Sequence, residues 1–338
     1  MDRTRAGRIS YYWPPASVSS GVRRQLHAVK VSAFITLGVI LLCPQFTAAE
    51  SPPASFAYVL QADSFAKSKS AVIERLAASG RDWIVLDANF DGVTSWERAD
   101  IDAIRSGHVD RKVVAYISIG EAEDYRPYWR KEWGRNGKLT PIAPAWLVVE
   151  NPDWKGNYRV KYWNAEWKKL MLAAIDDAMA RGFDGVYLDI VDGFEPFEQE
   201  GKEFIDDRVN PETKQSYRRD MVDLVRAIAA RARAKNPAAP VIPQNGSQHV
   251  VHADFLEIIS AIGIEDLFTN GNKVQPKSHM NEVLGHLSKV AAAKKPALLI
   301  EYPKSAERQA LTKKLAVENR LVWLVTDRQL KTLGESGR

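Results

Sequence analysis

The 338-residue sequence contains one cysteine, Cys43, which excludes a fold that depends on disulfide bonds. No apolar run reaches the length of about 18 residues that a membrane-spanning helix requires. Internal repeats and low-complexity tracts are absent, and 45% of the residues are hydrophobic, which excludes a fibre or a wholly disordered chain. The sequence therefore predicts a globular protein with a sizeable core.

Motifs of several enzyme classes are also missing. The sequence has no Gly-x-Ser-x-Gly elbow, no His-Glu-x-x-His pair, no Gly-x-Gly-x-x-Gly turn and no Walker-type loop. His249 and His252 are three residues apart, but no nearby carboxylate completes a metal site, so we interpret them as loop residues. We therefore expect no metal and no cofactor.

The sequence begins with a segment typical of export signals. Arg23, Arg24 and Lys30 precede the apolar run 31–43, and small residues at 47–49 suit a signal peptidase. We predict a cleaved signal peptide over residues 1–49 and a linker over 50–55, with an uncleaved anchor as the alternative. The mature protein is then expected in the periplasm or outside the cell, without a stable membrane anchor.

The net positive charge of the sequence comes from this first segment. Six of the 47 Lys and Arg residues and one of the 42 Asp and Glu residues lie before residue 50, so residues 50–338 carry 41 of each. A protein with no net charge and no nucleotide loop is poorly suited to bind nucleic acid. We expect no nucleic-acid partner.

Short β-branched and aromatic runs alternate with segments of helical periodicity from residue 56 onward. Eight such runs are predicted strands: residues 56–60, 83–87, 113–118, 185–190, 240–244, 264–268, 297–302 and 321–326. Continuous apolar strands separated by helices indicate a parallel sheet that is buried on both faces. We predict an α/β fold, a (β/α)8 TIM barrel over residues 56–330, as a single monomeric domain. An open doubly wound sheet is the alternative.

Two helices illustrate the pattern. Residues 165–180 place apolar side chains on one face, Asn164 can cap the first turn, and Gly182 follows the end. Another helix is expected to begin at Asn210–Pro211, a capping residue followed by proline. The long stretch 121–163 is predicted to be an insertion after the third strand, with extra strands near 145–149 and 158–162.

Polar residues collect where the predicted strands end, which is the catalytic end of a barrel. They are Gln61, Asp87, Glu121, Asp189, Asp192, Gln244, Asn245, Glu265, Glu301, Tyr302 and Asp327. Buried carboxylates are costly unless they are paired, so a purely structural barrel does not need so many. Two acids in one cleft are typical of glycoside hydrolysis, in which one protonates the leaving oxygen.

Two further features suit a sugar ligand. Six tryptophans fall between Trp129 and Trp167, and those among polar residues, Trp129, Trp133 and Trp154, either pack in the core or stack on sugar rings. The segment 189–207 contains eight acids and one base, Lys202, and such a segment attracts cations unless it is only a solvated loop.

Four motifs resemble glycoside hydrolase family 114, the endo-α-1,4-polygalactosaminidases and their bacterial relatives. They are residues 115–126 (AYISIGEAEDYR), 151–157 (NPDWKGN), 182–192 (GFDGVYLDIVD) and 263–268 (GIEDLF). The resemblance covers roughly residues 56–327. It implies a TIM barrel that hydrolyses α-1,4-linked, partly deacetylated galactosamine polymers, so the expected partner is a cationic amino sugar polysaccharide.

The resemblance also implies roles for individual residues. Asp189 corresponds to the catalytic Asp of the family and Glu265 to its partner; we assign Asp189 as nucleophile and Glu265 as general acid/base, and the two roles could be exchanged. Ile190 departs from the family pattern, because fungal relatives have Asn there. A catalytically inactive polysaccharide-binding barrel of an exopolysaccharide system is the alternative function. The predicted substrate-binding residues are Asp87, Glu121, Arg126, Tyr187, Asp192, Asn245, Glu301 and Tyr302.

Overall fold

The computed structural model describes residues 52–135 and 137–338. The predicted signal peptide, residues 1–49, lies outside this range, as do the first two residues of the predicted linker. In the described part of the chain, no helix is both long enough and apolar enough to cross a membrane.

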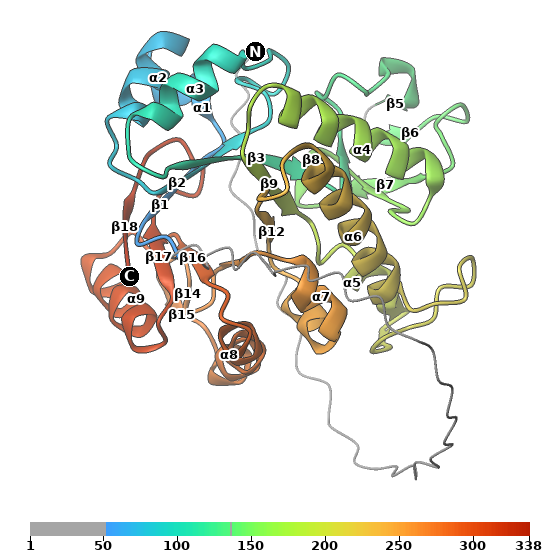
Figure 1. Ribbon diagram of the computed structural model, residues 1–338. Helices are drawn as coiled ribbons and strands as arrows, with labels where there is room; N and C mark the ends of the chain where they lie inside the picture. Colours follow the sequence, from blue (N-terminus) through green and yellow to red (C-terminus); the bar gives the residue numbers. More distant parts are fainter. Residues whose placement is uncertain (1–51, 136) are drawn as a thin grey trace, which may run out of the picture.

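The fold is an α/β arrangement around a mostly parallel sheet (Figure 1). Each of the eight predicted strands is present; β2 has the predicted bounds, and no strand end differs from the prediction by more than three residues. They are β1 (Phe56–Val59), β2 (Trp83–Asp87), β3 (Lys112–Ser118), β9 (Gly185–Asp189), β12 (Val241–Pro243), β13 (Ile262–Glu265), β16 (Ala297–Glu301) and β17 (Val322–Val325).

Two parallel ladders contain these strands. One ladder has the order β1-β2-β3-β9-β12, and the other runs β13-β16-β17 and ends with the antiparallel strand β18 (Glu335–Gly337). A single parallel bridge between Gln244 and Gly263 joins the ladders. Among the described residues no ladder pairs β1 with β17; instead the backbone N–H groups of Leu60 and Gln61 donate to the Leu330 carbonyl over 2.9 and 3.1 Å.

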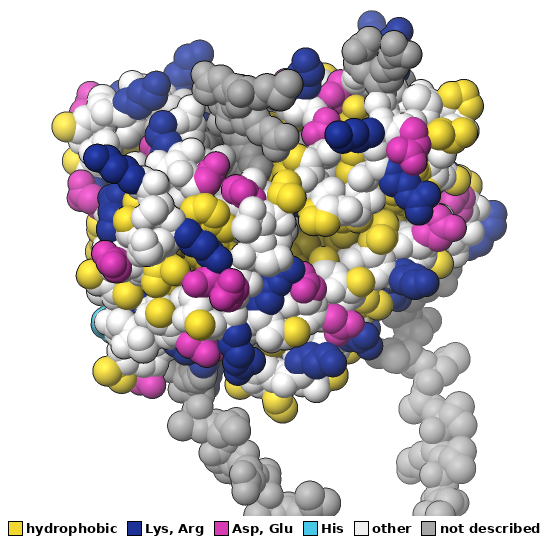
Figure 2. Space-filling model, turned by 90° about the horizontal axis from the view of Figure 1, so that it is seen from above, with side chains coloured by type: hydrophobic (Ala, Val, Ile, Leu, Met, Phe, Trp, Pro, Cys, Tyr) yellow, Lys and Arg dark blue, Asp and Glu magenta, His cyan; other side chains and the backbone are white. Residues whose placement is uncertain are grey.

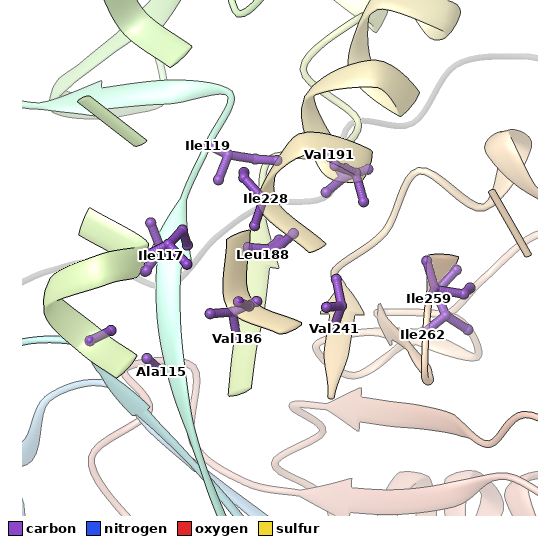
Figure 3. Close-up of a cluster of buried hydrophobic side chains, with 14 of the residues drawn as sticks. Ala115, Ile117, Ile119, Val186, Leu188, Val191, Ile228, Val241, Ile259 and Ile262 are labelled. Atoms are coloured by element: carbon purple, nitrogen blue, oxygen red, sulfur yellow. The ribbon is translucent and has the colours of Figure 1, made fainter. Parts of the chain in front are cut away.

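Both faces of the sheet are buried, and side chains alternate between them. On β9, Val186 and Leu188 pack on the outside with helix residues such as Ile228, and Figure 3 shows this outer cluster. Tyr187, between them, points the other way. The inner cluster it joins receives residues from all eight strands or the positions beside them: Phe56, Tyr58, Val85, Val114, Tyr116, Tyr187, Ile242, Ala261, Leu298, Ile300, Tyr302, Val322, Leu324 and Leu330. This alternation has the period of two expected for strands.

Helices lie outside the strands in Figure 1, where α4 and α6 run side by side. The α-helices are α1 (Ala62–Phe65), α2 (Lys69–Ala77), α3 (Arg98–Ser106), α4 (Ala165–Ala180), α5 (Glu195–Glu198), α6 (Tyr217–Lys235), α7 (Ala253–Ile258), α8 (Lys277–Ala292) and α9 (Ala306–Glu318). Two short 3₁₀ helices are η1 (Lys131–Trp133) and η2 (Ser247–Val251).

One predicted helix is confirmed and one begins elsewhere. Helix α4 has the predicted bounds, and the Asn164 side chain accepts a hydrogen bond from the Glu166 backbone N over 2.8 Å. The predicted start at Asn210–Pro211 is wrong, because Ser216 caps α6 by accepting from the Arg219 backbone N. Asn210 instead forms a local turn: its Oδ1 accepts from the Glu212 backbone N over 2.9 Å.

Small strands build the loops at the carboxyl ends of the main strands. Between β3 and α4 lie a three-stranded sheet, ordered β4-β8-β7, and the hairpin of β5 and β6; other hairpins follow β9 and β13. The strands are β4 (Glu121–Glu123), β5 (Gly134–Arg135), β6 (Lys138–Leu139), β7 (Leu147–Asn151), β8 (Trp154–Val160), β10 (Gln199–Glu200), β11 (Glu203–Phe204), β14 (Thr269–Asn270) and β15 (Lys273–Val274).

The inner cluster requires a glycine on β13. The Tyr187 hydroxyl donates to Gln244 Oε1 next to Gly263. A Cβ at Gly263 would lie 1.9 Å from the Tyr187 hydroxyl oxygen and 2.2 Å from Gln244 Oε1, far inside contact distance. Gly263 therefore makes room for two polar side chains, Tyr187 from β9 and Gln244 from the residue after β12.

We predict that Gly263→Ala destabilises the protein by about 1–3 kcal/mol, the usual cost of overpacking a core. Gly285→Ala on α8 is the matched control, because nothing lies within 4 Å of its added Cβ. The control should be neutral or stabilising by up to about 1 kcal/mol, since alanine favours a helix. Urea unfolding measures both. Equal stability of the two variants would contradict the packing described here.

Candidate active site

Asp189 lies at the carboxyl end of β9, where the chain turns sharply. Its side chain is 1% exposed; Oδ2 accepts a hydrogen bond from the Tyr116 hydroxyl, and Oδ1 accepts from the Ile190 backbone N over 2.8 Å. Both bonds favour the ionised carboxylate. Ile190 has a φ of +57°, a conformation that is strained for a β-branched residue. The turn thus gives the Asp189 carboxylate a fixed orientation.

Gly120 allows the neighbouring loop to approach this turn. A Cβ at Gly120 would lie 2.2 Å from the Ile190 carbonyl oxygen, so a larger residue cannot occupy the position. The Ile119 backbone N also donates to the Asp189 carbonyl over 2.9 Å. Glu121, at the start of β4, therefore follows directly on the segment that contacts the Asp189 turn.

Glu265 is the last residue of β13, and residues that follow the two neighbouring strands, β12 and β16, hold it in place. It is 5% exposed, its Oε1 accepts from the Tyr302 hydroxyl, and its backbone N donates to Asn245 Oδ1 over 3.1 Å. Burial, followed by the charge of Glu265, raises the pKa of Tyr302 well above its usual value. The Tyr302 hydroxyl therefore keeps its proton and acts as the donor.

Tyr58 on β1 is influenced by the charges of both carboxyl groups. It is 1% exposed, and its ring centroid lies 5.1 Å from that of Tyr187 and 6.2 Å from that of Tyr116. Burial raises the pKa of Tyr58 well above its usual value, and the negative charges of Asp189 and Glu265 add to this effect. Asp189 and Glu265 therefore both lie within electrostatic reach of one tyrosine in the inner cluster.

An ion pair lies next to Glu265. Asp266 is fully buried, and both of its oxygens accept hydrogen bonds of 2.6 Å from the two terminal nitrogens of Arg328. The Arg328 guanidinium also lies 4.0 Å from the centroid of the Tyr302 ring. Arg328 follows β17, so the loops after β13, β16 and β17 meet around Glu265.

Glu121 is held by two asparagines of one hairpin. Its Oε1 accepts from Asn151 Nδ2 over 2.7 Å and its Oε2 from Asn157 Nδ2 over 3.3 Å. Asn151 ends β7 and Asn157 lies on β8, so the 151–157 motif forms the hairpin that holds Glu121. Its two asparagines orient a buried carboxylate beside the Asp189 turn.

Asp87 and Arg126, two predicted substrate-binding residues, bind each other. Both Asp87 oxygens accept from the terminal nitrogens of Arg126 over 2.6 and 2.8 Å, and Arg126 Nε donates to Glu123 Oε2 over 2.6 Å. All three side chains are buried. Burial lowers the pKa of Arg126, but the charges of Asp87 and Glu123 outweigh this, so its pKa lies well above the usual value. This triad fixes the loop after β3 to the end of β2.

Glu301 and Tyr187 also have internal partners. Glu301 accepts from the Phe268 backbone N over 2.6 Å and from the backbone N of Thr269 over 3.1 Å, so it anchors the loop after β13. Burial raises the pKa of Glu301 to about 8, although these hydrogen bonds oppose the shift. Tyr187 is completely buried, and its hydroxyl donates a hydrogen bond to Gln244 Oε1.

The acidic segment 189–207 is partly neutralised. Arg218 Nη2 donates to the buried Glu198 over 2.8 Å and also bonds Asp206. Glu195 accepts from Gln248 Nε2 over 3.1 Å, and burial raises its pKa to about 7. Asp192 is partly exposed at the start of this loop. Figure 2 shows acidic and basic side chains interspersed on the face that it draws, in keeping with the equal numbers of each after residue 49.

Two of the candidate sugar-binding tryptophans pack against the core. The Trp129 ring stacks on Tyr158 with centroids 4.8 Å apart, and its edge meets Trp133 at 5.6 Å. Trp133 in turn contacts the buried Trp146 at 5.5 Å. Trp129 and Trp133 therefore pack against the core, and both are also partly exposed. Trp154 is partly exposed at the start of β8.

The structure thus brings Asp189, Tyr187 and Glu265 close to Tyr58, with Asn245 and Tyr302 bound to Glu265 and Glu121 beside the Asp189 turn. The sequence interpretation missed Tyr58, Tyr116, Asp266 and Arg328. Tyr116 and Asp266 lie inside two of the quoted motifs, and Tyr58 occupies an alternate position of the first strand. Arg328 carried no comparable signal. Among residues 52–135 and 137–338, no group of three His, Cys, Asp or Glu side chains is arranged to hold a metal ion.

The sequence model for glycoside-hydrolase family GH114 matches residues 43–337. A protein of Deinococcus radiodurans, described as uncharacterized, is 34% identical over 243 residues, which cover 72% of this chain and 70% of that protein. The uncharacterized protein MJ1477 of Methanocaldococcus jannaschii is 34% identical over 238 residues, and the alignment spans 69% of this chain and 64% of that relative.

Two solved structures share the fold. The glycoside hydrolase domain of PelA from Pseudomonas aeruginosa is 19% identical with a TM-score of 0.58, and the alignment covers 84% of this chain and 98% of that domain. Aspergillus fumigatus Ega3, crystallised in complex with galactosamine, is 18% identical with a TM-score of 0.59, at coverages of 86% and 99%.

The buried triad yields a stability prediction. Arg126→Met leaves Asp87 and Glu123 buried without their cation, so we expect it to destabilise the protein by about 3–5 kcal/mol. Arg231→Met is the control, because the pair of Arg231 with Asp176 is largely exposed and should leave the stability nearly unchanged. Urea unfolding at pH 7 compares them. A small effect of Arg126→Met would show that Arg126 does not hold the triad together.

Proposed function

The chain belongs to glycoside-hydrolase family GH114, and we propose that it cleaves internal bonds of an α-1,4-linked, galactosamine-containing polysaccharide. The observation that carries this proposal is the placement of Asp189 and Glu265. Both are buried at the carboxyl ends of parallel strands, and each accepts a hydrogen bond from a tyrosine hydroxyl. The negative charges of both raise the pKa of Tyr58. Glycoside hydrolysis requires such a pair of carboxyl groups.

In the proposed mechanism, Glu265 donates its proton to the glycosidic oxygen while the bond from that oxygen to the anomeric carbon breaks. Asp189 is the ionised partner, because the Tyr116 hydroxyl and the Ile190 backbone N both donate to it. With carboxyl groups about 5 Å apart Asp189 attacks the anomeric carbon itself, and at roughly 6.5 to 9.5 Å it takes a proton from an attacking water. In the first route a water then attacks the anomeric carbon and the bond from that carbon to Asp189 breaks, while Glu265 accepts the proton of the water.

Two observations support an amino sugar as the substrate. Ega3, which shares the fold, was crystallised with galactosamine. The segment 189–207 is acidic and follows the catalytic strand directly, so it favours a ligand that carries ammonium groups. The partly exposed Asp192 and Asn245 are proposed to contact the sugar. The buried residues Asp87, Glu121, Arg126, Tyr187, Glu301 and Tyr302 are proposed to shape the site around it.

We also infer that the main strands form a (β/α)8 barrel with residues 121–163 as an insertion after β3. The strand order, the bridge between the ladders, and the inner cluster that draws on all eight strands or the positions beside them support this inference. Export through residues 1–49, to the periplasm or outside the cell, and action as a single-domain monomer complete the proposal.

The test is the release of reducing ends from a partly deacetylated galactosamine polymer. We expect Asp189→Asn and Glu265→Gln each to lower kcat/KM by at least about 10²-fold, because each removes a group that transfers a proton or attacks the anomeric carbon. Asp176→Asn and Glu318→Gln are matched controls on the surface, and they should retain full activity.

Undiminished activity in Asp189→Asn or Glu265→Gln would contradict the site assignment. Polymer binding is measured alongside by the retention of each variant on a galactosamine-polymer column. A wild-type protein that binds the polymer but releases no reducing ends would instead support the polysaccharide-binding barrel.

A further inference from the structure

The ion pair of Arg328 and Asp266 lies directly beside the proposed catalytic residue Glu265. Asp266 follows Glu265 directly and is fully buried, whereas Arg328 arrives from the loop after β17. The two side chains meet in a bidentate geometry, with both nitrogen–oxygen distances at 2.6 Å. Such a pair is strongly oriented, so each partner fixes the position of the other.

Arg328 has a second contact, with Tyr302. Its guanidinium carbon lies 4.0 Å from the centroid of the Tyr302 ring, within the range of a cation–π interaction. The hydroxyl of the same tyrosine donates to Glu265 Oε1. A chain of contacts therefore runs from Asp266 through Arg328 and Tyr302 back to Glu265.

The loop that carries Arg328 is itself well fixed. Asp327 Oδ1 accepts from the Gln329 backbone N over 3.0 Å, and its Oδ2 accepts from the Thr332 hydroxyl over 2.6 Å. Asp327, a strand-end acid in the sequence, thus builds the turn after β17. Its neighbour Arg328 is presented toward Tyr302 as a result.

We propose that Arg328 and Asp266 are positioning residues for Glu265: together they hold Tyr302 in place and cancel each other's charge, so that Glu265 can carry the proton of a general acid. This inference rests on the proposed function, because it explains how one of the two carboxyl groups keeps a proton. The inference also gives a role to the loop after β17, although no residue of that loop takes part in the proposed reaction itself.

The charges around Glu265 support this role. Arg328 alone would stabilise the ionised carboxylate, which is the wrong state for a proton donor. Asp266 places a compensating negative charge on the same guanidinium, so burial of Glu265 can favour its neutral form. Several titratable or polar groups face the Glu265 carboxyl group from the elements packed around it: Tyr58 on β1, Asn245 after β12, Tyr302 after β16, Arg328 after β17, and Asp189 across Tyr58. His279 on α8 contacts the Asp266 backbone.

The experiment follows the ionisation of Glu265 directly. In the full protein labelled with 13C at the glutamate carboxyl carbon, NMR gives a titration midpoint for Glu265, and its signal is assigned by its loss in Glu265→Gln. Asp266→Asn leaves the Arg328 cation uncompensated, so the midpoint should fall by about one pH unit. Arg328→Met removes the cation, so the midpoint should rise by a similar amount.

The double variant Arg328→Met with Asp266→Asn is decisive, because it removes both charges. We expect the Glu265 midpoint of the double variant to return to within about 0.3 pH unit of the wild type. That difference is small compared with the shift expected in each single variant. Arg231→Met serves as the control for loss of an arginine elsewhere, and it should not move the Glu265 midpoint. If Arg328→Met does not fold, Asp266→Asn and the double variant still decide the question.

An unmoved Glu265 midpoint in Asp266→Asn, or single variants that shift it in the same direction, would overturn the inference. A purely structural role for the pair would lower stability without these opposite shifts. The titration needs no substrate, so failure of the wild type to cleave any galactosamine polymer would reject the proposed function and leave this measurement valid. With an active wild type, the basic limb of the pH profile of kcat/KM should follow the same shifts.

Discussion

A carboxylate that is removed from water loses several kcal/mol of hydration unless hydrogen-bond donors replace it, and this constraint governs the end of the sheet where the main strands finish. Each buried acid there has defined donors: Arg126 for Asp87, two asparagines for Glu121, Tyr116 for Asp189, Tyr302 for Glu265. The donors come from different strands and loops. Satisfying the acids therefore also fixes the loops to one another.

The donors divide the acids into two groups with different chemistry. Asp87 and Asp266 each bind an arginine fork, so each is paired with a cation. Asp189 and Glu265 instead bind neutral tyrosine hydroxyls whose rings belong to the inner cluster. A neutral donor holds a carboxyl group in place without committing it to a permanent ion pair. That arrangement suits groups that must gain or lose a proton, which is what a pair of carboxyl groups does in glycoside hydrolysis.

Much of the fold could be predicted from the sequence, because periodicity and capping are local signals. The eight strands and the bounds of α4 are examples, and so is Asp189 at the end of its strand. Glu265 ends its strand because β13 finishes three residues earlier than predicted. Features that depend on contacts between distant segments could not be predicted. Asn210 looked like a helix cap, yet Ser216 caps α6, and nothing local distinguished Asp87, bound by Arg126, from Asp189. Arg328 contacts Asp266 only because the loops after β13 and β17 meet.

The central claim is that Asp189 and Glu265 flank the bond that is broken. A crystal structure of Glu265→Gln with a bound galactosamine oligosaccharide tests it most directly. We predict a glycosidic oxygen within hydrogen-bonding distance of residue 265, and an Asp189 oxygen facing the adjacent anomeric carbon either directly or through one water. An oligosaccharide bound with its glycosidic oxygens next to other carboxylates, away from these two residues, would contradict the account.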